Sequence, residues 1–522
     1  MADYEYNIDM KISDKSVESK IFSLDKMETF VSSIKNKNKT ISLCHGVFDL
    51  LHPGHIQHFK EASELSDYLF VSVTSDKYVN KGPGRPLFPE KVRIESLAAL
   101  ENIDGVLISD YPNAIQVLKC IKPDFYVKGP DYANIKNDTK GMLVKEKEAV
   151  EAYGGKIYFS KGLTSSSSML INNYYSNVDK GTQDWINSFK EAGGYESVLD
   201  SIAKIANLKT VILGETIIDQ YTYCNSLAKS SKDPILAFQL FDTSYYPGGI
   251  LSIANICSDL TSETSLISCV APNDPNLKVV KDKINSKIQQ NLVLTNDRPT
   301  ILKHRYVDTH SNTKVFEYYD FVDSPLSSDT NTQLIEYIIK LIKNTDLIIA
   351  ADYGHGFFSN TLISYIQQLP VFLAVNTQAN AGNRGYNTIS KYPRADLITF
   401  NGAELELELR DRNPDYFSIV PKIIKQKNSQ NAIVTLGAGG LIVFDNDGNH
   451  EKVPAFANKV VDKVGAGDAV FSIASLLAKV NAPLKVIGFL ANLVAAHEVS
   501  QLGHQKSLTS SDLLKHVKAI LR

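Results

Sequence analysis

Two short segments of the sequence concentrate residues that could carry out phosphate chemistry, and the first is CHGVFDLLHPGHIQH. Pro53 follows an apolar run and predicts a helix entry at which His52 and His55 face the same side. Gly46 and Gly54 permit close approach of the backbone to a ligand, and a helix N-terminus binds phosphate. Two imidazoles placed there could stabilise negative charge on phosphate oxygens in a transition state. The alternative is a pair of solvated histidines in a turn.

The second segment is DKVGAGDAVFSIASLLA, which places two glycines and a carboxylate at the entry of a predicted helix. The amides of Gly465, Ala466 and Gly467 can form an anion hole at the positive end of the helix dipole. Asp468 can then accept the proton of an alcohol that attacks a γ-phosphate. The alternative is that the glycines only make a turn and Asp468 only caps the helix.

Two arrays of alternating strands and helices must position these segments. Between residues 40 and 172, apolar runs such as ISLCHGV and YLFVSVTSD alternate with helical stretches. A second array begins near residue 205 with TVILGE, continues through LIIAAD, VFLAVN, LITFN and AIVTLG, and ends in helices. Strand and helix in alternation predict an α/β fold, here two domains that are each a parallel sheet with crossover helices.

We therefore expect four regions along the chain. Residues 1–38 form an N-terminal helical extension, in which Ser23 caps a helix. Residues 39–175 form the first α/β domain, residues 176–204 a polar linker that holds Trp185, and residues 205–522 the second domain.

The composition is that of an ordinary globular protein, with 43% hydrophobic residues, 22% charged residues and a formal net charge of -3. This composition excludes a disordered chain. The chain has no overall positive charge that would favour binding to nucleic acid. Five scattered cysteines lack metal or disulfide spacing and predict free thiols in a reducing compartment. The polar N-terminus is unlike a signal peptide, and no uncharged apolar stretch reaches about 18 residues. We expect a cytoplasmic protein without a membrane span.

GVFDLLHPGH, with its HxGH element, resembles the signature of the nucleotidyltransferase superfamily, which joins a nucleotide to a phosphorylated alcohol and releases pyrophosphate. The resemblance covers roughly residues 40–172 and implies a cytidylyltransferase-like, Rossmann-like domain that uses ATP or CTP with Mg²⁺. It implies that the phosphorylated alcohol attacks the α-phosphorus directly, so the protein supplies position and charge. The implied catalytic residues are His52, His55, Lys128 and Arg93. The implied nucleotide-binding residues are Gly46, Phe48, Asp49, Gly54, Ser166, Ser167 and Ser168.

DxxGAGD resembles the signature of the ribokinase-like sugar kinases, and the companion motifs GETIID, PGG, PTILKHR, ADYGHG, NGAE and TLGAGG follow in the family's order. The resemblance covers nearly all of 205–522 and implies a kinase domain with a small β-lid that uses ATP and Mg²⁺. The implied substrate-binding residues are Asp219, Gly248, Gly249, Lys303, Arg305 and Asp352. Asn401 and Glu404 are implied at the metal, and Thr435, Gly437, Gly440 and Asn492 at ATP.

A kinase fused to a transferase resembles the bifunctional heptose-phosphate kinase/adenylyltransferases of lipopolysaccharide-core and capsule precursor synthesis, with the domain order swapped. The resemblance implies phosphorylation of a heptose 7-phosphate-like sugar at C1 and nucleotidyl transfer to the sugar 1-phosphate. Ser252, Asn376 and His355 depart from the kinase pattern, so a second interpretation keeps both chemistries on another sugar or polyol. A third is that one domain has decayed into a binding module. By analogy with kinases of this fold, a homodimer paired through the β-lid is expected.

Overall fold

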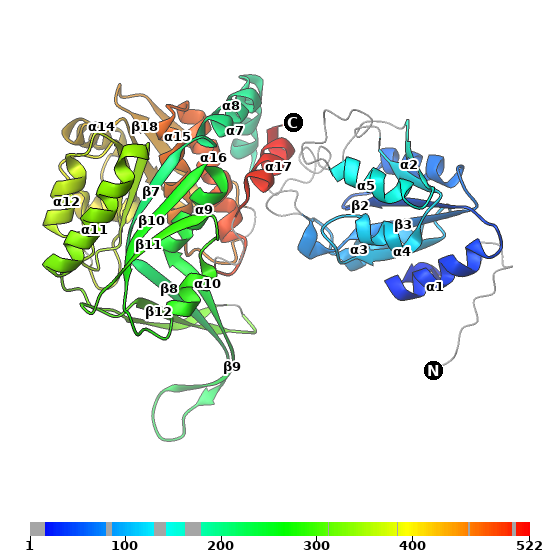
Figure 1. The fold of residues 1–522 in the computed structure, drawn as a ribbon, viewed down its shortest axis with the longest axis horizontal. Helices are drawn as coiled ribbons and strands as arrows, with labels where there is room; N and C mark the ends of the chain where they lie inside the picture. The colour runs from blue at the N-terminus through cyan, green and yellow to red at the C-terminus, as the bar shows by residue number, and fades with distance from the viewer. Residues whose placement is uncertain are drawn as a thin grey trace. The chain divides into compact units, whose positions relative to one another are not determined.

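The computed structural model describes residues 16–79, 86–129, 142–161, 179–311, 313–383, 385–457, 460–503 and 508–521. The chain divides into two compact units, Met1–Asn177 and Val178–Arg522 (Figure 1). Each unit combines a largely parallel sheet with helices that connect its strands, so the predicted α/β class is confirmed.

The first unit is built on a six-stranded parallel sheet with the strand order β1-β4-β3-β2-β5-β6. Its strands are β1 (Ile21–Phe22), β2 (Ile41–Gly46), β3 (Tyr68–Thr74), β4 (Gly105–Ser109), β5 (Phe125–Lys128) and β6 (Lys156–Phe159). Its helices are α1 (Leu24–Lys35), α2 (Pro53–Ser63), α3 (Glu90–Ala98), α4 (Ile115–Ile121) and α5 (Met142–Glu151). The strand order reverses beside β2, since β3 and β5 pair with its two edges. Open parallel sheets bind ligands at the carboxyl end of such a strand.

The predicted N-terminal helix exists, but it is part of the first unit's core rather than an extension. Ser23 accepts a hydrogen bond from the amide of Lys26 and caps α1, as its side chain predicted. The strand β1 pairs in parallel with β4, and Phe22 stacks on Phe30 at 5.2 Å between ring centroids. This edge strand was not predicted, because a strand of two residues is too short to show a pattern.

The second unit is built on a nine-stranded sheet with the order β11-β10-β7-β14-β15-β16-β17-β18-β19. It is parallel from β11 to β17, and β18 pairs antiparallel with both β17 and β19. The strands are β7 (Lys209–Gly214), β10 (Glu263–Val270), β11 (Ile288–Leu294), β14 (Leu347–Asp352), β15 (Phe372–Thr377), β16 (Leu397–Asn401), β17 (Asn431–Thr435), β18 (Leu441–Asp445) and β19 (His450–Val453).

Helices cover both faces of this sheet, and each face has its own apolar cluster. One face carries α7 (Lys180–Glu191), α8 (Gly194–Ile205), α9 (Ile250–Leu260), α10 (Leu277–Lys283), α15 (Ala466–Lys479), α16 (Leu484–Val499) and α17 (Ser510–Leu521). The other carries α11 (Ser328–Leu341), α12 (Asn360–Gln367), α13 (Gly402–Leu409) and α14 (Tyr416–Lys427). The second unit is therefore a three-layer α/β/α body.

A separate four-stranded sheet, ordered β13-β12-β8-β9, forms the expected β-lid. Its strands are β8 (Thr216–Lys229), β9 (Leu236–Gly249), β12 (Ile301–Asp308) and β13 (Lys314–Asp320). The hairpin of β8 and β9 extends well beyond the body of the unit (Figure 1).

The predicted linker at 176–204 is wrong over the residues that the structure describes, because α7 and α8 fill 180–205 and pack on the second unit. The indole N–H of Trp185 donates to Glu451 at 2.9 Å. The ring of Phe189 lies 5.2 Å from that of Trp185 and 5.4 Å from that of Phe489. The segment is polar on average, and this composition concealed an amphipathic helix whose apolar stripe is buried.

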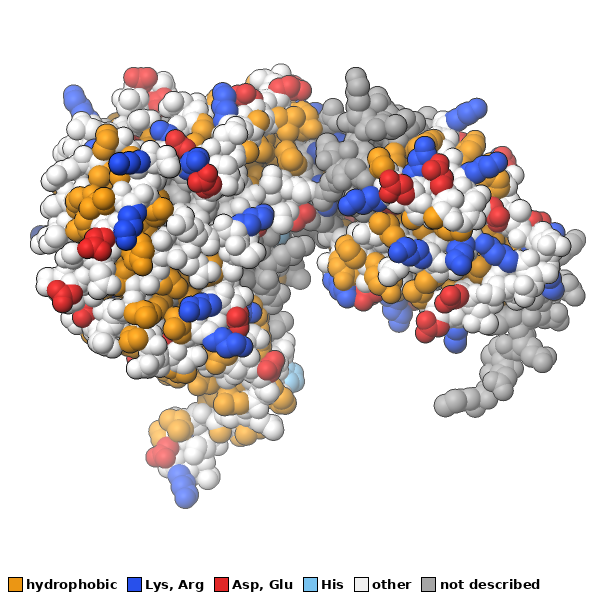
Figure 2. All heavy atoms as spheres, in the orientation of Figure 1, with side chains coloured by type: hydrophobic (Ala, Val, Ile, Leu, Met, Phe, Trp, Pro, Cys, Tyr) orange, Lys and Arg blue, Asp and Glu red, His pale blue; other side chains and the backbone are white. Residues whose placement is uncertain are grey.

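Among the described residues, no helix has both the length and the apolar character needed to span a bilayer. Basic and acidic side chains are interspersed over the face seen in Figure 2. The five cysteines are free thiols, as the spacing predicted, and all except Cys120 are buried.

Candidate active sites

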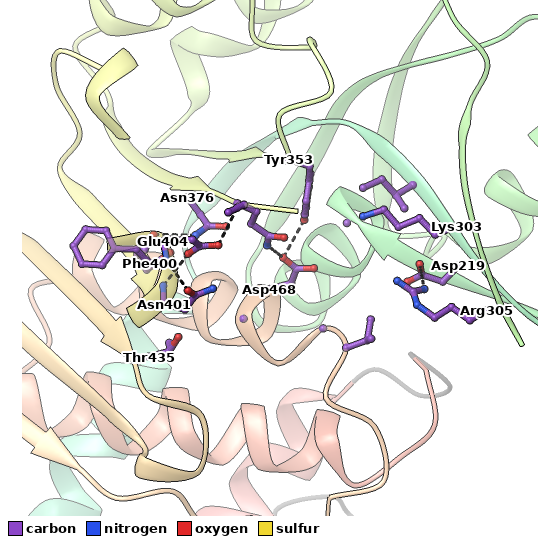
Figure 3. A pocket seen from close by; sticks show the side chains of 18 residues that line it. Asp219, Lys303, Arg305, Tyr353, Asn376, Phe400, Asn401, Glu404, Thr435 and Asp468 are labelled. Atoms are coloured by element: carbon purple, nitrogen blue, oxygen red, sulfur yellow. Dashed lines mark hydrogen bonds and ion pairs between the residues drawn. The ribbon is translucent and has the colours of Figure 1, made fainter. Parts of the chain in front are cut away.

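The second unit contains a pocket of ≈ 280 Å³ at the carboxyl ends of β15, β16 and β17, between the lid and the entry of α15. Many predicted residues line it: Asp219, Gly249, Lys303, Arg305, Asn401, Glu404, Thr435, Gly465, Gly467 and Asp468. Figure 3 shows Asp468 between two ends of the pocket, one holding Asp219 with Lys303 and Arg305, the other Asn401 with Glu404.

Asp468 lies in the first turn of α15, whose N-cap, Gly465, has a left-handed φ of 86°. That conformation favours glycine. Oδ1 of Asp468 accepts hydrogen bonds from the hydroxyl of Tyr353 at 3.0 Å and from Nε2 of Gln378 at 2.6 Å. The carboxylate thus borders the pocket beside the first amides of the helix, which lack intrahelical partners. A hydroxyl group in the pocket could transfer its proton to Asp468.

At the lid end of the pocket, Asp219 on β8 forms a buried ion pair with Arg305 on β12. Gly248 leaves room for this carboxylate, because a Cβ atom there would lie 2.6 Å from Oδ2 of Asp219. Lys303 is paired in register with Asp219, and burial lowers the pKa of its ammonium group. A carboxylate between two cations can bind sugar hydroxyls and also an anionic group on the substrate.

At the opposite end, Asn401 and Glu404 form a capping box at the start of α13. Each side chain accepts from the other's backbone amide at 2.8 Å, and Oε1 of Glu404 also accepts from Ala379 at 3.2 Å. Burial raises the pKa of Glu404 to about 7. A buried carboxylate of this kind gains stability from a nearby cation.

The same end of the pocket fits a hydrated Mg²⁺ ion. Oδ1 of Asn376 and Oγ1 of Thr399 are buried there without a hydrogen-bond partner among the described residues. Oxygen atoms of amides, hydroxyls and carboxylates suit Mg²⁺, which keeps several of its waters. The described residues contain no group of three or more His, Cys, Asp or Glu side chains that could hold a metal ion.

Six predicted residues of the second unit are not among those that line the pocket: Gly248, Asp352, Gly437, Gly440, Ala466 and Asn492. Asp352 is buried and accepts from the Tyr392 hydroxyl at 2.7 Å, and it also pairs with Lys391. Asn492 on α16 donates to the carbonyl of Val453 at 3.2 Å, so it supports the sheet. Gly440 shapes the turn after β17, since a Cβ atom there would lie 2.0 Å from the Val453 carbonyl. A motif shows where such a residue stands along the chain, but not which way its side chain points.

Sequence reasoning missed the donors to Asp468, Tyr353 and Gln378, and did not place Asn376 or Thr399 in the site. All four stand in or directly after a parallel strand, close to its carboxyl end. That position was a usable signal, because parallel sheets build their sites there. Gly437 has a φ of 57° in the turn after Thr435 and is not among the residues that line the pocket.

In the first unit the two predicted histidines come together at the entry of α2. The ring centroids of His52 and His55 are 3.8 Å apart. His52 is the N-cap, and its Nδ1 accepts from the amide of Gly54 at 3.1 Å. The two imidazoles therefore stand at the positive end of a helix that follows β2, which is where a phosphate would bind.

The loop before α2 is shaped by Phe48, which has a left-handed φ of 48°. Its ring lies over Gly46, where a Cβ atom would approach it to 3.0 Å, and packs on His55 at 5.4 Å between centroids. The carboxylate of Asp49 accepts from the amide of Phe88 at 3.0 Å. In this structure these residues hold the loop that carries the histidines.

Arg93 was predicted to share the charge of the transition state, but the structure gives its guanidinium group a structural role. The side chain is 0% exposed and pairs with Asp76 at 2.7 Å. Its nitrogens donate to the backbone carbonyls of Val47, Thr74 and Phe88. With at least four of its five N–H groups in use, Arg93 joins the histidine loop to β3 rather than offering charge to a ligand.

Lys128 ends β5 and forms a nearly buried ion pair with Glu146 on α5, at 2.7 Å. It also lies 4.8 Å from the ring centroid of Tyr126. A phosphate group would have to compete with Glu146 for this ammonium. The predicted residues Ser166, Ser167 and Ser168 lie outside the described residues.

Comparison with protein families supports both resemblances. A family model described as pfkB family carbohydrate kinase matches residues 207–511, which is more than half of the chain. A second model, described as cytidylyltransferase-like, matches residues 43–176. The suspected fusion of a carbohydrate kinase domain with a nucleotidyltransferase-like domain is therefore confirmed.

Curated relatives match the N-terminal part of the chain. The bifunctional protein HldE of Syntrophotalea carbinolica is 34% identical over 142 residues, and that of Geotalea uraniireducens 36% identical over 142 residues. Each match covers 27% of this chain and 28% of the relative. The chain thus spans little more than a quarter of the length of these relatives.

Solved structures resemble the larger part of the chain. Phosphofructokinase-2 from Escherichia coli in complex with potassium is 17% identical, has a TM-score of 0.50, and is covered over 100% of its length by 60% of this chain. A mutant of the same enzyme matches at 16% identity with a TM-score of 0.50. At this identity the likeness shows the fold alone.

Proposed function

Because the chain belongs to the pfkB family of carbohydrate kinases, we propose that its second unit transfers the γ-phosphoryl group of ATP to a sugar hydroxyl. The observation that carries the proposal is the position of Asp468, a carboxylate that borders the pocket at the entry of α15. A carboxylate in this place can act as a general base beside an anion-binding helix end.

In the proposed reaction the sugar lies between Asp219 and Asp468, and Asp468 removes the proton from the attacking oxygen. The amides of Gly465, Ala466 and Gly467 stabilise the charge that develops on the transferred phosphoryl group. Asn401 and Glu404 would hold the waters of Mg²⁺, which neutralises phosphate charge when bound. Thr435, next to Asn401 in register, and the turn with Gly437 and Gly440 would border ATP.

For the first unit we propose nucleotidyl transfer from ATP or CTP to a sugar 1-phosphate, with release of pyrophosphate. The likeness to a cytidylyltransferase-like model and the paired imidazoles of His52 and His55 support it. A phosphate oxygen of the sugar attacks the α-phosphorus, the bond to the pyrophosphate oxygen breaks, and the two imidazoles stabilise the departing charge. Lys128 would add its charge if the nucleotide displaces Glu146.

Taken together, the two units would activate a sugar by phosphorylation at C1 and nucleotidyl transfer. For a substrate that already carries a phosphate, a separate phosphatase would remove that phosphate between the two steps. A heptose 7-phosphate-like substrate is compatible with the cations Lys303 and Arg305 at the lid end of the pocket, which could pair with its phosphate group. The product would serve surface-polysaccharide synthesis. The alternative substrate is another sugar or polyol phosphate, for which the same pocket chemistry holds.

A second candidate function applies to the first unit alone. Arg93 is committed to backbone carbonyls and Lys128 to Glu146, which favours a unit that binds nucleotide without transferring it. Release of pyrophosphate decides between the two functions, because a binding module releases none.

We also propose that the chain forms a homodimer through its lid. Large apolar side chains on the lid strands are exposed: Leu240 58%, Phe241 57%, Phe316 58% and Tyr318 43%. A second copy covering them would remove this apolar area from water. Sedimentation of the full chain should give a dimer, and Phe316→Lys should shift it towards the monomer.

The test is to incubate the full chain with Mg²⁺, ATP or CTP and a panel of sugars and sugar phosphates that includes heptose 7-phosphate. Mass spectrometry identifies the products, while ADP and pyrophosphate are measured separately. ADP release with a sugar 1-phosphate product supports the kinase, and no ADP with any acceptor contradicts it. His55→Ala should abolish pyrophosphate release and leave ADP release intact, because the two sites lie on different units.

A further inference from the structure

We infer that Gln378 and Tyr353 are positioning residues for Asp468, fixing the direction of its carboxylate and favouring its ionised form. The inference rests on the proposed kinase function of this pocket. Both side chains donate to the same atom, Oδ1 of Asp468, at 2.6 Å from Nε2 of Gln378 and 3.0 Å from the Tyr353 hydroxyl. Figure 3 shows the Tyr353 hydroxyl directed at this carboxylate.

The two donors come from different segments, which are themselves tied together. Tyr353 follows β14 and Gln378 follows β15. The side-chain amides of Asn380 and Asn383 donate to the Tyr353 carbonyl at 2.8 and 2.7 Å. Asn383 also donates to the carbonyl of Gln378 at 3.3 Å. The two donors therefore form one rigid support, with little freedom to follow a carboxylate that rotates.

The chain at and after Tyr353 is fixed as well. The carboxylate of Glu215 accepts from the amides of Tyr353 at 3.2 Å and His355 at 3.1 Å. Gly354 has a φ of 74°, and a Cβ atom there would lie 2.0 Å from Nδ2 of Asn383. Only glycine at 354 leaves room for the side-chain amide of Asn383 to bond to this turn.

Both side chains remain hydrogen-bond donors over the pH range in which a kinase works. Burial raises the pKa of Tyr353 well above its usual value, and Asp468 adds to that rise. The amide of Gln378 does not titrate. Hydrogen bonds donated to a carboxylate favour its charged form, which is the form that accepts a proton from the sugar.

Other charges also act on Asp468, so the effect of the donors must be separated from theirs. The ionisable groups around the carboxylate are Lys303 and Arg305 from β12, Asp219 from β8, Glu404 from α13 and Glu215 behind Tyr353. None of them changes when Gln378 is replaced by an uncharged side chain of similar size. A shift in pH dependence in that variant therefore reports the lost hydrogen bond.

The variants are Gln378→Met and Tyr353→Phe, each of which removes one donor and keeps most of the volume. Gln333→Met, on the exposed side of α11, is the matched control. We expect kcat for ADP release to fall about 10- to 100-fold in each variant, which corresponds to loss of one hydrogen bond to a charged group. The acid limb of the pH–rate profile should move to higher pH, with KM for ATP unchanged.

A double variant separates positioning from a purely structural role. With Asp468→Asn already present, Gln378→Met should cause little further loss, because both changes act through one base. The inference is overturned if Gln378→Met lowers kcat by the same factor in the wild type and in Asp468→Asn. It is also overturned if the single variants leave kcat and the acid limb of the pH–rate profile unchanged. If the wild-type chain releases no ADP with any acceptor, the proposed function itself fails. Tyr353→Phe gives the same readouts should Gln378→Met fold poorly.

Discussion

Lys314, on lid strand β13, forms an ion pair with Asp462, which stands three residues before Gly465. The hydroxyl of Tyr221, on lid strand β8, donates to the same carboxylate at 2.6 Å. Burial would raise the pKa of Asp462, but these two partners reverse the effect and the pKa is lowered. One buried carboxylate thus connects two lid strands to the loop that leads into α15, and the lid contributes to the order of that loop.

Lys314→Met should loosen this connection and weaken binding of the sugar more than it slows the chemical step. Loss of one partner of a partly buried ion pair costs about 1–2 kcal/mol after allowance for exposure. We therefore expect KM for the sugar to rise about 5- to 30-fold, with a smaller change in kcat, in steady-state ADP assays. A change in KM for ATP alone would contradict this role of the lid.

Asp468→Asn should reduce kinase turnover by about 10²–10⁴-fold, which is the usual cost of removing a general base. Because asparagine keeps the size of the side chain, affinity for sugar and ATP should change little. Single-turnover ADP formation and equilibrium binding of ATP measure the two quantities. Near-wild-type turnover would mean that Asp468 only supports the start of α15, where asparagine serves almost as well.

Glu404→Gln should raise the Mg²⁺ concentration needed for half-maximal ADP release. Glutamine can still complete the capping box with Asn401, so α13 should remain folded. The pKa of about 7 for Glu404 should make the Mg²⁺ requirement of the wild type depend on pH. Above that pH its carboxylate is ionised and attracts the cation, so the Mg²⁺ requirement should fall as pH rises from about 6 to 8. This trend should be absent in Glu404→Gln, while pyrophosphate release by the first unit keeps its Mg²⁺ dependence.

Arg93→Met should destabilise the first unit, because it leaves several buried carbonyl groups and Asp76 without their donor. The expected loss is about 2–4 kcal/mol in the free energy of unfolding, measured by urea titration. Arg93→Lys keeps the charge but cannot reach the same set of acceptors, so it should be only partly better. A fully stable Arg93→Met that has lost nucleotidyl transfer would restore the catalytic role predicted from the motif.

The first unit should lose stability as the pH falls from about 6.5 to 4. Burial lowers the pKa of His58 to about 4, whereas the unfolded chain takes up this proton near pH 6.5. Between these values the unfolded state binds the extra proton, so the stabilisation present above pH 6.5 is lost on acidification, up to about 3 kcal/mol. His45, whose pKa burial lowers to about 3, acts in the same direction.

Urea unfolding at pH 7.5 and pH 5 should show this loss, and His58→Gln should reduce it. His310→Gln, in an exposed turn of the lid, is the control and should leave the loss unchanged. Equal acid sensitivity in His58→Gln and the wild type would contradict the assignment to His58.

The sequence by itself determined the alternation of strands and helices within two α/β units and the places of His52, His55 and Asp468 at helix entries. These features depend on local patterns, since an apolar strand followed by glycine or proline and a helix specifies a strand-to-helix turn wherever it occurs. The same local patterns predicted the cap at Ser23.

The tertiary structure alone decided where the side chains point. Tyr353 and Gln378 meet Asp468 across 115 and 90 residues of sequence, and Tyr221 meets Asp462 across 241. The buried side chain of Arg93 makes the same kind of distant contact, because it donates to the carbonyl of Val47, 46 residues away in the sequence. Such contacts depend on strand register and packing between segments far apart in the chain, which no local pattern records. The motifs therefore located the candidate sites, and only the folded chain showed which residues contact the side chains in them.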